Sequence, residues 1–501
     1  MMVCAAIARL VAYGIEQQLC LPSDALYVRH RLMALLKQDT WFEPSAGFSV
    51  PAFGHVQEVL DELLACALAR QLLPNDGITQ KDLFDTALMD CLLPPPSVVQ
   101  RAFASDFAQS PRQATDVYYH QSRASNYVRV ARIAKNLTWV YDSAFGVLDV
   151  TVNLSKPEKD PKAIIAEGSS KSETYPQCLL CRENEGYAGR VDHPARQNLR
   201  LMPLALCDEP WFLQYSPYEY YTEHCIVLKA AHEPMSISTQ TFARLLSFVE
   251  LFPHYFVGSN ADLPIVGGSI LSHDHFQGGR YDFAMANAQP VHSQVSSLQP
   301  DVTMHLLHWP MSVVRLVGAQ AMDVLSVADD VLRRWRAYSD ASVEVLAFSG
   351  EENTPHNTIT PIARQRDGVF ELDLVLRNNR TSAEHPLGIF HPHGELHHIK
   401  KENIGLIEVM GLAVLPDRLA PSMAVMQRCL EGLAQFNDHP ELSAHADWFA
   451  DVSRAYDGRS DAQTFMRAQV GRVFEQVLTH AGVFKQTDAG IAAFKRFLVH
   501  F

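Results

Sequence analysis

The stretch Gly267-Gly268-Ser269-Ile270-Leu271-Ser272-His273-Asp274-His275-Phe276-Gln277-Gly278-Gly279 carries the most information about the fold and chemistry of the chain. It places His273, His275 and Gln277 at alternate positions between two pairs of glycines. Residues two apart in a β-strand share a face, so we expect these three side chains to enter one site. Glycines let backbone N–H groups approach a phosphate closely. The stretch therefore predicts a strand that carries a phosphate-handling site.

Histidines in such a strand are suited to phosphoryl chemistry. A neutral imidazole can attack phosphorus without first losing a proton, and the phosphoramidate that forms is labile enough to turn over. A side-chain amide such as that of Gln277 can donate a hydrogen bond to a phosphoryl oxygen as charge shifts there. The alternative is a pair of core histidines that hydrogen-bond within a sheet, which would not need the flanking glycines. The candidate substrate-binding residues in and before the stretch are Asn260, Gly267, Gly268, Ser269 and Ser272.

A second candidate site is the Cys-x-x-Cys pair formed by Cys178 and Cys181. In a cytosolic chain such a pair serves metal binding or redox exchange, and the polar residues around it indicate a loop rather than the strand-to-helix junction of a redox motif. A structural zinc site needs two further ligands, for which His232 and His273 are the candidates. The alternative is two buried thiols without a metal.

A third cluster is the run His-Pro-His-Gly-Glu-Leu-His-His at residues 391–398, which begins with His391 and His393. These side chains could contact a substrate phosphate, bind a metal or form a polar strand edge. The apolar run at residues 404–415 has a helix-like pattern and would give the cluster a rigid support. We therefore include His391 and His393 among the candidate substrate contacts.

A lysine-rich loop follows a strand pattern in the first half of the chain. Residues 146–154 alternate in the manner of a strand, and the loop after them carries Lys156, Lys159 and Lys162. A solvated turn is the ordinary interpretation of such a loop. Lys156 and Lys159 are nevertheless candidate substrate-binding residues.

The apolar pattern divides the chain into regions of different character. Up to about residue 116 apolar residues recur at helical spacing. From there to about residue 420, β-rich runs such as residues 225–228 and 343–348 alternate with helical stretches such as residues 241–252, and the remainder returns to helix. We predict an α+β protein with a helical N-terminal region and a helical C-terminus. The expected regions are a helical part at 1–116, a half with the metal and nucleophile motifs at 117–300, and a second α+β half at 301–501.

Composition limits the classes of partner. The 501 residues are 47% hydrophobic and 20% charged, as in ordinary globular proteins of more than one domain. A formal net charge of -14 argues against nucleic acid as the main partner. The nine cysteines are an odd number and scattered, unlike a secreted disulfide framework. The chain lacks the run of about 18 apolar residues that a membrane span needs. We expect a cytoplasmic location and no membrane partner.

Taken together, these motifs resemble the galactose-1-phosphate uridylyltransferases, specifically the divergent second family found mainly in bacteria. That family is related to the histidine triad superfamily. The resemblance covers most of the chain and rests on four blocks in the expected order: residues 153–162, 178–181, 267–279 and 391–416.

The resemblance implies histidine-triad-like antiparallel sheet halves and a nucleotidyltransferase. Such an enzyme transfers UMP from UDP-glucose to galactose 1-phosphate in a ping-pong reaction, with glucose 1-phosphate and UDP-galactose as products and a uridylyl-histidine as intermediate. His275 matches the nucleophile and Gln277 the amide that contacts the phosphoryl oxygens. The better-known first family ligates a structural zinc through residues similar to Cys178, Cys181, His232 and His273. The resemblance also implies a homodimer.

The sequence departs from the first family at two points. Asp274 stands between the two histidines, where the first family has a proline, and Lys156 and Lys159 stand where it has arginines. Two other functions remain open. One is a nucleotide phosphorylase or hydrolase of the same superfamily, in which phosphate or water replaces the second sugar. The other is a non-catalytic zinc-bearing protein that binds sugar nucleotides.

Overall fold

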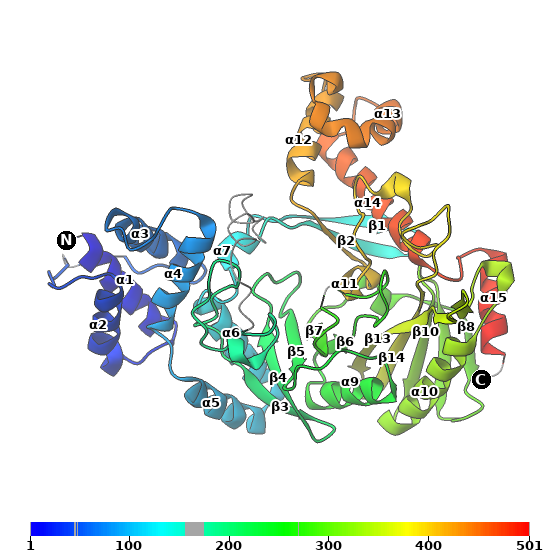
Figure 1. Ribbon diagram of the computed structural model, residues 1–501, viewed down its shortest axis with the longest axis horizontal. Coiled ribbons are helices and arrows are strands. Elements are labelled where there is room, and N and C mark those ends of the chain that lie inside the picture. The colour runs from blue at the N-terminus through cyan, green and yellow to red at the C-terminus, as the bar shows by residue number, and fades with distance from the viewer. Residues whose placement is uncertain (1, 45–46, 48, 156–174, 269, 500) are drawn as a thin grey trace. The chain divides into compact units, whose positions relative to one another are not determined.

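The computed structural model describes every residue except 1, 45–46, 48, 156–174, 269 and 500 (Figure 1). Contacts divide the chain into two compact units that interleave along the sequence. Unit 1 comprises Met1–Lys135, Ser155–Glu219 and Glu223–Glu233, and unit 2 comprises Asn136–Leu154, Tyr220–Thr222 and Pro234–Phe501. The three regions expected from the sequence, 1–116, 117–300 and 301–501, stay a prediction.

The N-terminal part of unit 1 is helical, as predicted. Its helices bury an apolar core that includes Ile7, Leu60 and Leu63. Prolines mark two helix starts, since Pro96 begins one helix and Pro111 the next, where their missing N–H groups cost no hydrogen bond. The helices are α1 (Met2–Glu16), α2 (Ala25–Leu35), α3 (Val56–Ala69), α4 (Ile78–Asp90), α5 (Pro96–Gln109), α6 (Pro111–Ala124) and α7 (Val130–Ile133).

Unit 1 also contains an antiparallel meander. It consists of β3 (Met202–Leu206), β4 (Glu209–Tyr215) and β5 (Cys225–Lys229), which pair in sequence order. The two residues between β3 and β4, Cys207 and Asp208, both have positive φ, which is the backbone of a tight two-residue hairpin turn.

Unit 2 is built around an antiparallel sheet with the strand order β7-β6-β13-β14-β10-β9-β8. Helices α9 (Thr239–Leu251) and α10 (Ala321–Ala337) pack against it (Figure 1). The strands are β6 (Phe256–Gly258), β7 (His275–Gly279), β8 (Pro290–Val295), β9 (Val302–Leu307), β10 (Val313–Gly318), β13 (Asn357–Arg366) and β14 (Val369–Asn378). A two-stranded ribbon joins β11 (Phe348–Ser349) to β12 (Thr354–Pro355).

A second, smaller sheet in unit 2 joins distant parts of the chain. Strand β2 (Gly146–Val152) pairs antiparallel with β1 (Leu137–Ser143) and parallel with β15 (Leu412–Leu415). Helix α14 (Ala462–Ala481) packs on β1, where the indole N–H of Trp139 donates to the carbonyl of Arg467 at 3.1 Å. The remaining helices of this part are α11 (Leu406–Val409), α12 (Leu419–Leu430), α13 (Ala446–Ala455) and α15 (Asp488–Leu498).

These elements confirm the α+β class and the helical regions at both ends, but two local predictions are wrong. Residues 343–348 do not form a strand, because Glu344 has a φ of 61°, in the left-handed region, and the chain turns there. The apolar run at 404–415 is not one helix. The short helix α11 ends before Gly411, whose φ of 111° lets the chain turn into strand β15.

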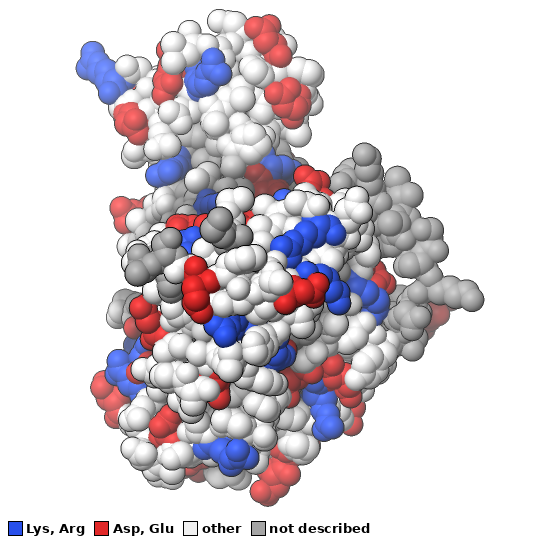
Figure 2. Space-filling view, turned by 90° about the vertical axis from the view of Figure 1, so that its left-hand side faces the viewer, with Lys and Arg blue, Asp and Glu red and all other residues white. Residues whose placement is uncertain are grey.

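The helices and the surface charge bear on possible partners of the protein. Within the described residues, none of the helices has the length and apolar character needed to cross a membrane. On the face shown in Figure 2, lysines and arginines are interspersed with aspartates and glutamates.

Candidate active site

The candidate nucleophile opens strand β7. His275 and Gln277 are two residues apart in this strand and lie on one face of it, and Gln277 pairs with Gly258 of β6. His273 lies in a bend two residues before the strand begins. The prediction that all three side chains belong to one strand is therefore correct for His275 and Gln277 and wrong for His273.

The local structure fixes the tautomer of His275. Its Nδ1 atom lies 2.8 Å from the backbone carbonyl oxygen of His273. A carbonyl can only accept, so Nδ1 carries the proton and the lone pair is on Nε2. Burial lowers the pKa of His275 to about 4, so the ring is neutral at neutral pH. A buried, neutral imidazole with a basic Nε2 is the form that can attack phosphorus.

A buried ion pair anchors the residue between the two histidines. The guanidinium of Arg244, on helix α9, lies 3.3 Å from the carboxylate of Asp274, and both side chains are about nine-tenths buried. Such a pair needs a carboxylate at position 274, and a proline there could not form it. Asp274 therefore links the segment that carries His275 to helix α9.

The paired glycines before the strand pack tightly on residues 260–263. A Cβ atom on Gly268 would lie 2.7 Å from the side-chain amide of Asn260, and one on Gly267 would lie 2.7 Å from the carbonyl oxygens of Ala261 and Leu263. Ile265, just before them, has a φ of 73°, which is strained for a β-branched residue. The loop thus needs glycine for close approach and contains local strain of the kind found at functional sites.

A polar network from the segment after the histidine cluster supports this loop. The carboxamide oxygen of Asn260 accepts a hydrogen bond from the backbone N–H of Leu406 at 2.9 Å. Glu408 accepts from the N–H of Gly405 at 3.2 Å and pairs with buried Lys400 at 2.8 Å. Sequence reasoning assigned no role to Lys400 or Glu408, although the charge of Glu408 within the apolar run at residues 404–415 was an available signal.

Three of the four predicted metal ligands lie together in unit 1. The sulfur atoms of Cys178 and Cys181 are 3.4 Å apart, and the Cys181 sulfur is 3.1 Å from Nδ1 of His232. The sulfur separation is much longer than the bond of about 2.05 Å in a disulfide. It suits two thiolates that bind one zinc ion at about 2.3 Å each. The fourth candidate, His273, belongs to unit 2 and is fully buried there.

Hydrogen bonds from the Asn184 side chain hold the loop that carries the two thiols. The side-chain amide of Asn184 donates to the carbonyl oxygens of Cys178 and Cys181, both at 2.8 Å. His193 in turn contacts the carboxamide oxygen of Asn184 at 2.7 Å. A ligand loop ordered by outer hydrogen bonds is typical of a structural metal site.

His391 lies close to the glycine loop. It is 3% exposed, and burial lowers its pKa to about 4. A Cβ on Gly388 would lie 2.9 Å from the Cβ of His391 and 3.0 Å from the side chain of Ile265, so the loop before His391 packs on the strained residue. The Nε2 atom of His393 lies 3.0 Å from the carbonyl oxygen of Ile389.

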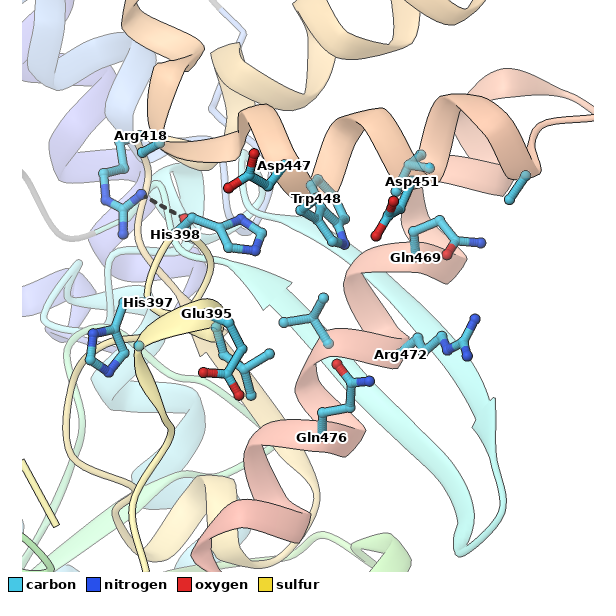
Figure 3. A pocket seen from close by; sticks show the side chains of 16 residues that line it. Glu395, His397, His398, Arg418, Asp447, Trp448, Asp451, Gln469, Arg472 and Gln476 are labelled. Carbon is cyan, nitrogen blue, oxygen red and sulfur yellow. Dashed lines mark hydrogen bonds between the residues drawn. The ribbon is translucent and has the colours of Figure 1, made fainter. Parts of the chain in front are cut away.

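The last of the predicted substrate-binding residues are exposed or lie outside the described part of the chain. Ser272 is exposed, and Lys156, Lys159 and Ser269 lie outside the described residues. A groove of about 830 Å³ in unit 2 is lined by residues of the histidine cluster and of the C-terminal helices, and it includes none of the predicted site residues (Figure 3). The side chains labelled there include Glu395, His397, His398, Arg418, Trp448 and Arg472.

Comparison with known proteins shows the family of the chain. Residues 19–234 match the N-terminal domain model of galactose-1-phosphate uridyl transferase, and residues 248–441 match the C-terminal domain model. The chain is 48% identical to galactose-1-phosphate uridylyltransferases of Clostridium acetobutylicum and of Bacillus subtilis. The first alignment covers 98% of both chains, and the second covers 98% of this chain and 96% of the relative. The chain thus belongs to the galactose-1-phosphate uridylyltransferase family, a family of nucleotidyltransferases.

A solved structure shows a much weaker likeness. The crystal structure of yeast Ap4A phosphorylase Apa2 matches with a TM-score of 0.32 and 10% identity, over 65% of this chain and 91% of that chain. At this level of similarity we base no argument on it.

Proposed function

We propose that this protein transfers UMP from UDP-glucose to galactose 1-phosphate through a covalent uridylyl-histidine at His275. In the first step Nε2 attacks the α-phosphorus of UDP-glucose. The P–N bond forms as the bond to the departing glucose 1-phosphate breaks. In the second step a phosphate oxygen of galactose 1-phosphate attacks the same phosphorus, the P–N bond breaks, and UDP-galactose leaves. The hydrogen bond from Nδ1 to the His273 carbonyl supports this role, because it leaves the lone pair on Nε2.

Residues around His275 take supporting roles in this proposal. Gln277, on the same strand face, donates to a phosphoryl oxygen, and the amides of the loop at Gly267 and Gly268 stabilise charge as it develops. Ser269, Ser272 and Asn260 provide further polar contacts to the substrate in this proposal. Lys156 and Lys159 bind phosphate charge. His391, packed beside the loop, contacts the second sugar phosphate together with His393.

The same proposal includes a structural zinc site. Cys178, Cys181 and His232 supply three ligands whose donor atoms lie within 4.8 Å of one another. His273 is proposed as the fourth ligand. Because His273 also provides the carbonyl that orients His275, an ordered His273 side chain would help to fix the nucleophile.

The proposal is tested by the intact mass of the protein after brief incubation with UDP-glucose alone. We expect a gain of one uridylyl group, reversed by galactose 1-phosphate. Release of glucose 1-phosphate without any gain in mass would favour a direct hydrolase or phosphorylase. The absence of both mass gain and product release would favour a protein that only binds sugar nucleotides.

Replacing Gly268 with alanine is expected to reduce transfer strongly while the chain still folds. The added methyl group would meet the Asn260 amide at 2.7 Å, so the glycine loop must move away from its position before the strand. A displacement of about 1 Å in a reacting geometry can cost on the order of 100-fold in rate. Steady-state kinetics would show the loss mainly in kcat. Gly394→Ala is the matched control, because a Cβ there meets nothing within 4 Å.

Loss of the proposed zinc ligands is expected to remove one metal ion per chain and to destabilise the fold. Cys178→Ser leaves an oxygen atom, which is a weaker zinc ligand than a thiolate sulfur. The zinc content per chain, measured by elemental mass spectrometry, should therefore fall. Thermal unfolding should begin at a lower temperature. Cys207→Ser, at an exposed cysteine, should change neither quantity. Equal zinc content in Cys178→Ser and the natural chain would refute this metal assignment and leave the transfer reaction untouched.

A further inference from the structure

Arg377, in strand β14, is a buried arginine that forms no ion pair with a carboxylate of the described residues. Two other arginines of the same sheet, Arg315 and Arg364, both pair with the carboxylate of Asp373, at 2.6 and 2.8 Å. Arg377 is only 2% exposed, and its Nε has no hydrogen-bond partner in that part of the chain. A buried cation without a counter-charge lowers stability, so we looked for a role of Arg377 other than support of the fold.

Strand pairing places Arg377 on the face of the sheet that carries the candidate nucleophile. Strands β7, β6, β13 and β14 lie side by side in that order, and one row of opposed residues consists of Gln277, Gly258, Ile362 and Asp373. Directly opposed residues share a face, as do residues an even number of positions apart in one strand. Arg377 stands in this relation to Asp373, and His275 to Gln277. Arg377 and His275 therefore project from the same face.

The guanidinium of Arg377 holds the segment at residues 404–406. Its Nη2 donates to the carbonyl oxygen of Ile404 at 3.0 Å, and its Nη1 donates to the hydroxyl oxygen of Thr360 in strand β13 at 3.2 Å. Burial lowers the pKa of Arg377 to about 10, and the charge of Glu408 opposes this shift, so the side chain is a cation at neutral pH. A charged donor forms a stronger hydrogen bond to a carbonyl than a neutral donor does.

That segment in turn contacts the surroundings of the candidate nucleophile. The backbone N–H of Leu406 donates to the carboxamide oxygen of Asn260 at 2.9 Å. A Cβ on Gly268, in the glycine loop, would lie 2.7 Å from the same carboxamide group. The Leu406 side chain packs over Gly258, where an added Cβ would lie 2.8 Å from Cδ1 of Leu406, and Gly258 pairs with strand β7. A shift of the segment would therefore reach both the glycine loop and strand β7.

We propose that Arg377 is a positioning residue for the transfer reaction, which acts through Asn260 to hold the glycine loop beside His275. The inference rests on the proposed function. Arg377 holds the carbonyl of Ile404, the segment then presents the N–H of Leu406 to Asn260, and Asn260 packs against the loop. Hydrogen-bonded partners of this kind keep a reactive side chain in its productive geometry although they do not touch the reacting atoms.

The test compares the natural chain with Arg377→Met, whose side chain is of similar length but has neither charge nor N–H groups. The readout is the rate at which the intact mass rises by one uridylyl group with UDP-glucose. We expect this rate to fall on the order of 100-fold, the effect of a displacement of about 1 Å in a reacting geometry. Arg377→Lys keeps a charged donor and should recover about tenfold of the loss.

The temperature of unfolding separates positioning from support of the fold. Arg377→Met removes a buried unpaired charge, which favours folding, but it leaves the Ile404 carbonyl without its donor, which opposes folding. These effects have opposite signs, so the unfolding temperature should change by less than about 4 °C. Arg380→Met is the matched control. Arg380 also donates to a backbone carbonyl, that of Glu344 at 2.6 Å, and its loss should leave the rate within about twofold.

A double variant tests the path through Asn260. Residues that act along one path are not additive, so Arg377→Met should slow Asn260→Ala by less than about threefold. A further loss as large as that of Arg377→Met alone would show that Arg377 does not act through Asn260 and would overturn the inference.

The outcomes separate the inference from the proposed function. If the natural chain gains mass and Arg377→Met gains it equally fast, the inference is wrong and the transfer reaction stands. A slow Arg377→Met that also unfolds at a much lower temperature, without recovery in Arg377→Lys, would mean that Arg377 only supports the fold. If the natural chain gains no mass, the proposed function is wrong and the inference falls with it.

Discussion

His275→Ala is expected to abolish measurable transfer of UMP from UDP-glucose to galactose 1-phosphate. Removal of a covalent nucleophile typically lowers kcat by a factor on the order of 10⁴–10⁶. Strand β7 places the ring in a buried position where its Nδ1 donates to a backbone carbonyl, and alanine leaves no other atom at the position of Nε2. Chromatographic measurement of UDP-galactose over time would show the loss.

The matched control for this variant is His292→Ala. His292 lies in strand β8 of the same sheet, and its ring contacts only the Gln294 side chain, at 3.4 Å, among the hydrogen bonds found for it. Its replacement should leave transfer within about twofold, as expected for a residue outside the site. If His275→Ala is folded by circular dichroism and still transfers within about tenfold of the natural chain, His275 is not the nucleophile.

The sequence was sufficient to predict those parts of the site that depend on short spacings. His275 and Gln277 share a strand face because residues two apart do so in any strand. The pair Cys178 and Cys181 is brought together by a single turn of loop, and His232 follows a strand of the same unit. For the two short spacings the local pattern alone determines which side chains meet, whereas His232 lies 51 positions after Cys181.

Contacts between distant segments could not be read from the sequence. Nothing in the residues around Asn260 shows that its carboxamide oxygen accepts a hydrogen bond from the N–H of Leu406, which is 146 positions away. The same is true of the contact between His393 and His480, whose ring centroids lie 4.3 Å apart. These contacts depend on the order of strands in the sheet, and that order follows from packing of the whole core rather than from any local period.

The apolar pattern predicted the wrong secondary structure where one glycine changes the direction of the backbone. Residues 404–415 have the apolar spacing of a helix, yet Gly411 with its positive φ divides them into helix α11 and strand β15. Strand β15 then pairs with β2. Pairing with a strand more than two hundred positions away in the chain outweighed the helical spacing, as tertiary context commonly does.

Asp373→Asn is expected to destabilise unit 2 by about 3–5 kcal/mol, because it removes one partner of a buried ion network. The carboxylate of Asp373 is fully buried and lies 2.6 Å from the guanidinium of Arg315 and 2.8 Å from that of Arg364. An amide cannot balance two buried positive charges. Thermal unfolding followed by circular dichroism should show a transition lowered by roughly 6–15 °C for a unit of this size.

The pH dependence of the natural chain provides an independent test of the same network. Burial alone would raise the pKa of Asp373, but the charges of Arg315 and Arg364 outweigh it and lower the pKa to about 2. A carboxylate with a lowered pKa stabilises the fold above its unfolded pKa of about 3.9, and this contribution is lost as the pH falls toward 2. Asp373→Asn should lose this part of the acid dependence.

Asp330→Asn is the matched control for charge and partner number. Asp330 on helix α10 also contacts two arginines, Arg333 and Arg334, but the Arg333 side chain is 67% exposed and that of Arg334 38%. Solvent screens such pairs, so the change should cost less than about 1 kcal/mol. If the two variants lost equal free energy of unfolding, the buried network would contribute no more than a surface pair. Solvent or Glu371 would then balance the charges of Arg315 and Arg364 in the absence of the Asp373 carboxylate.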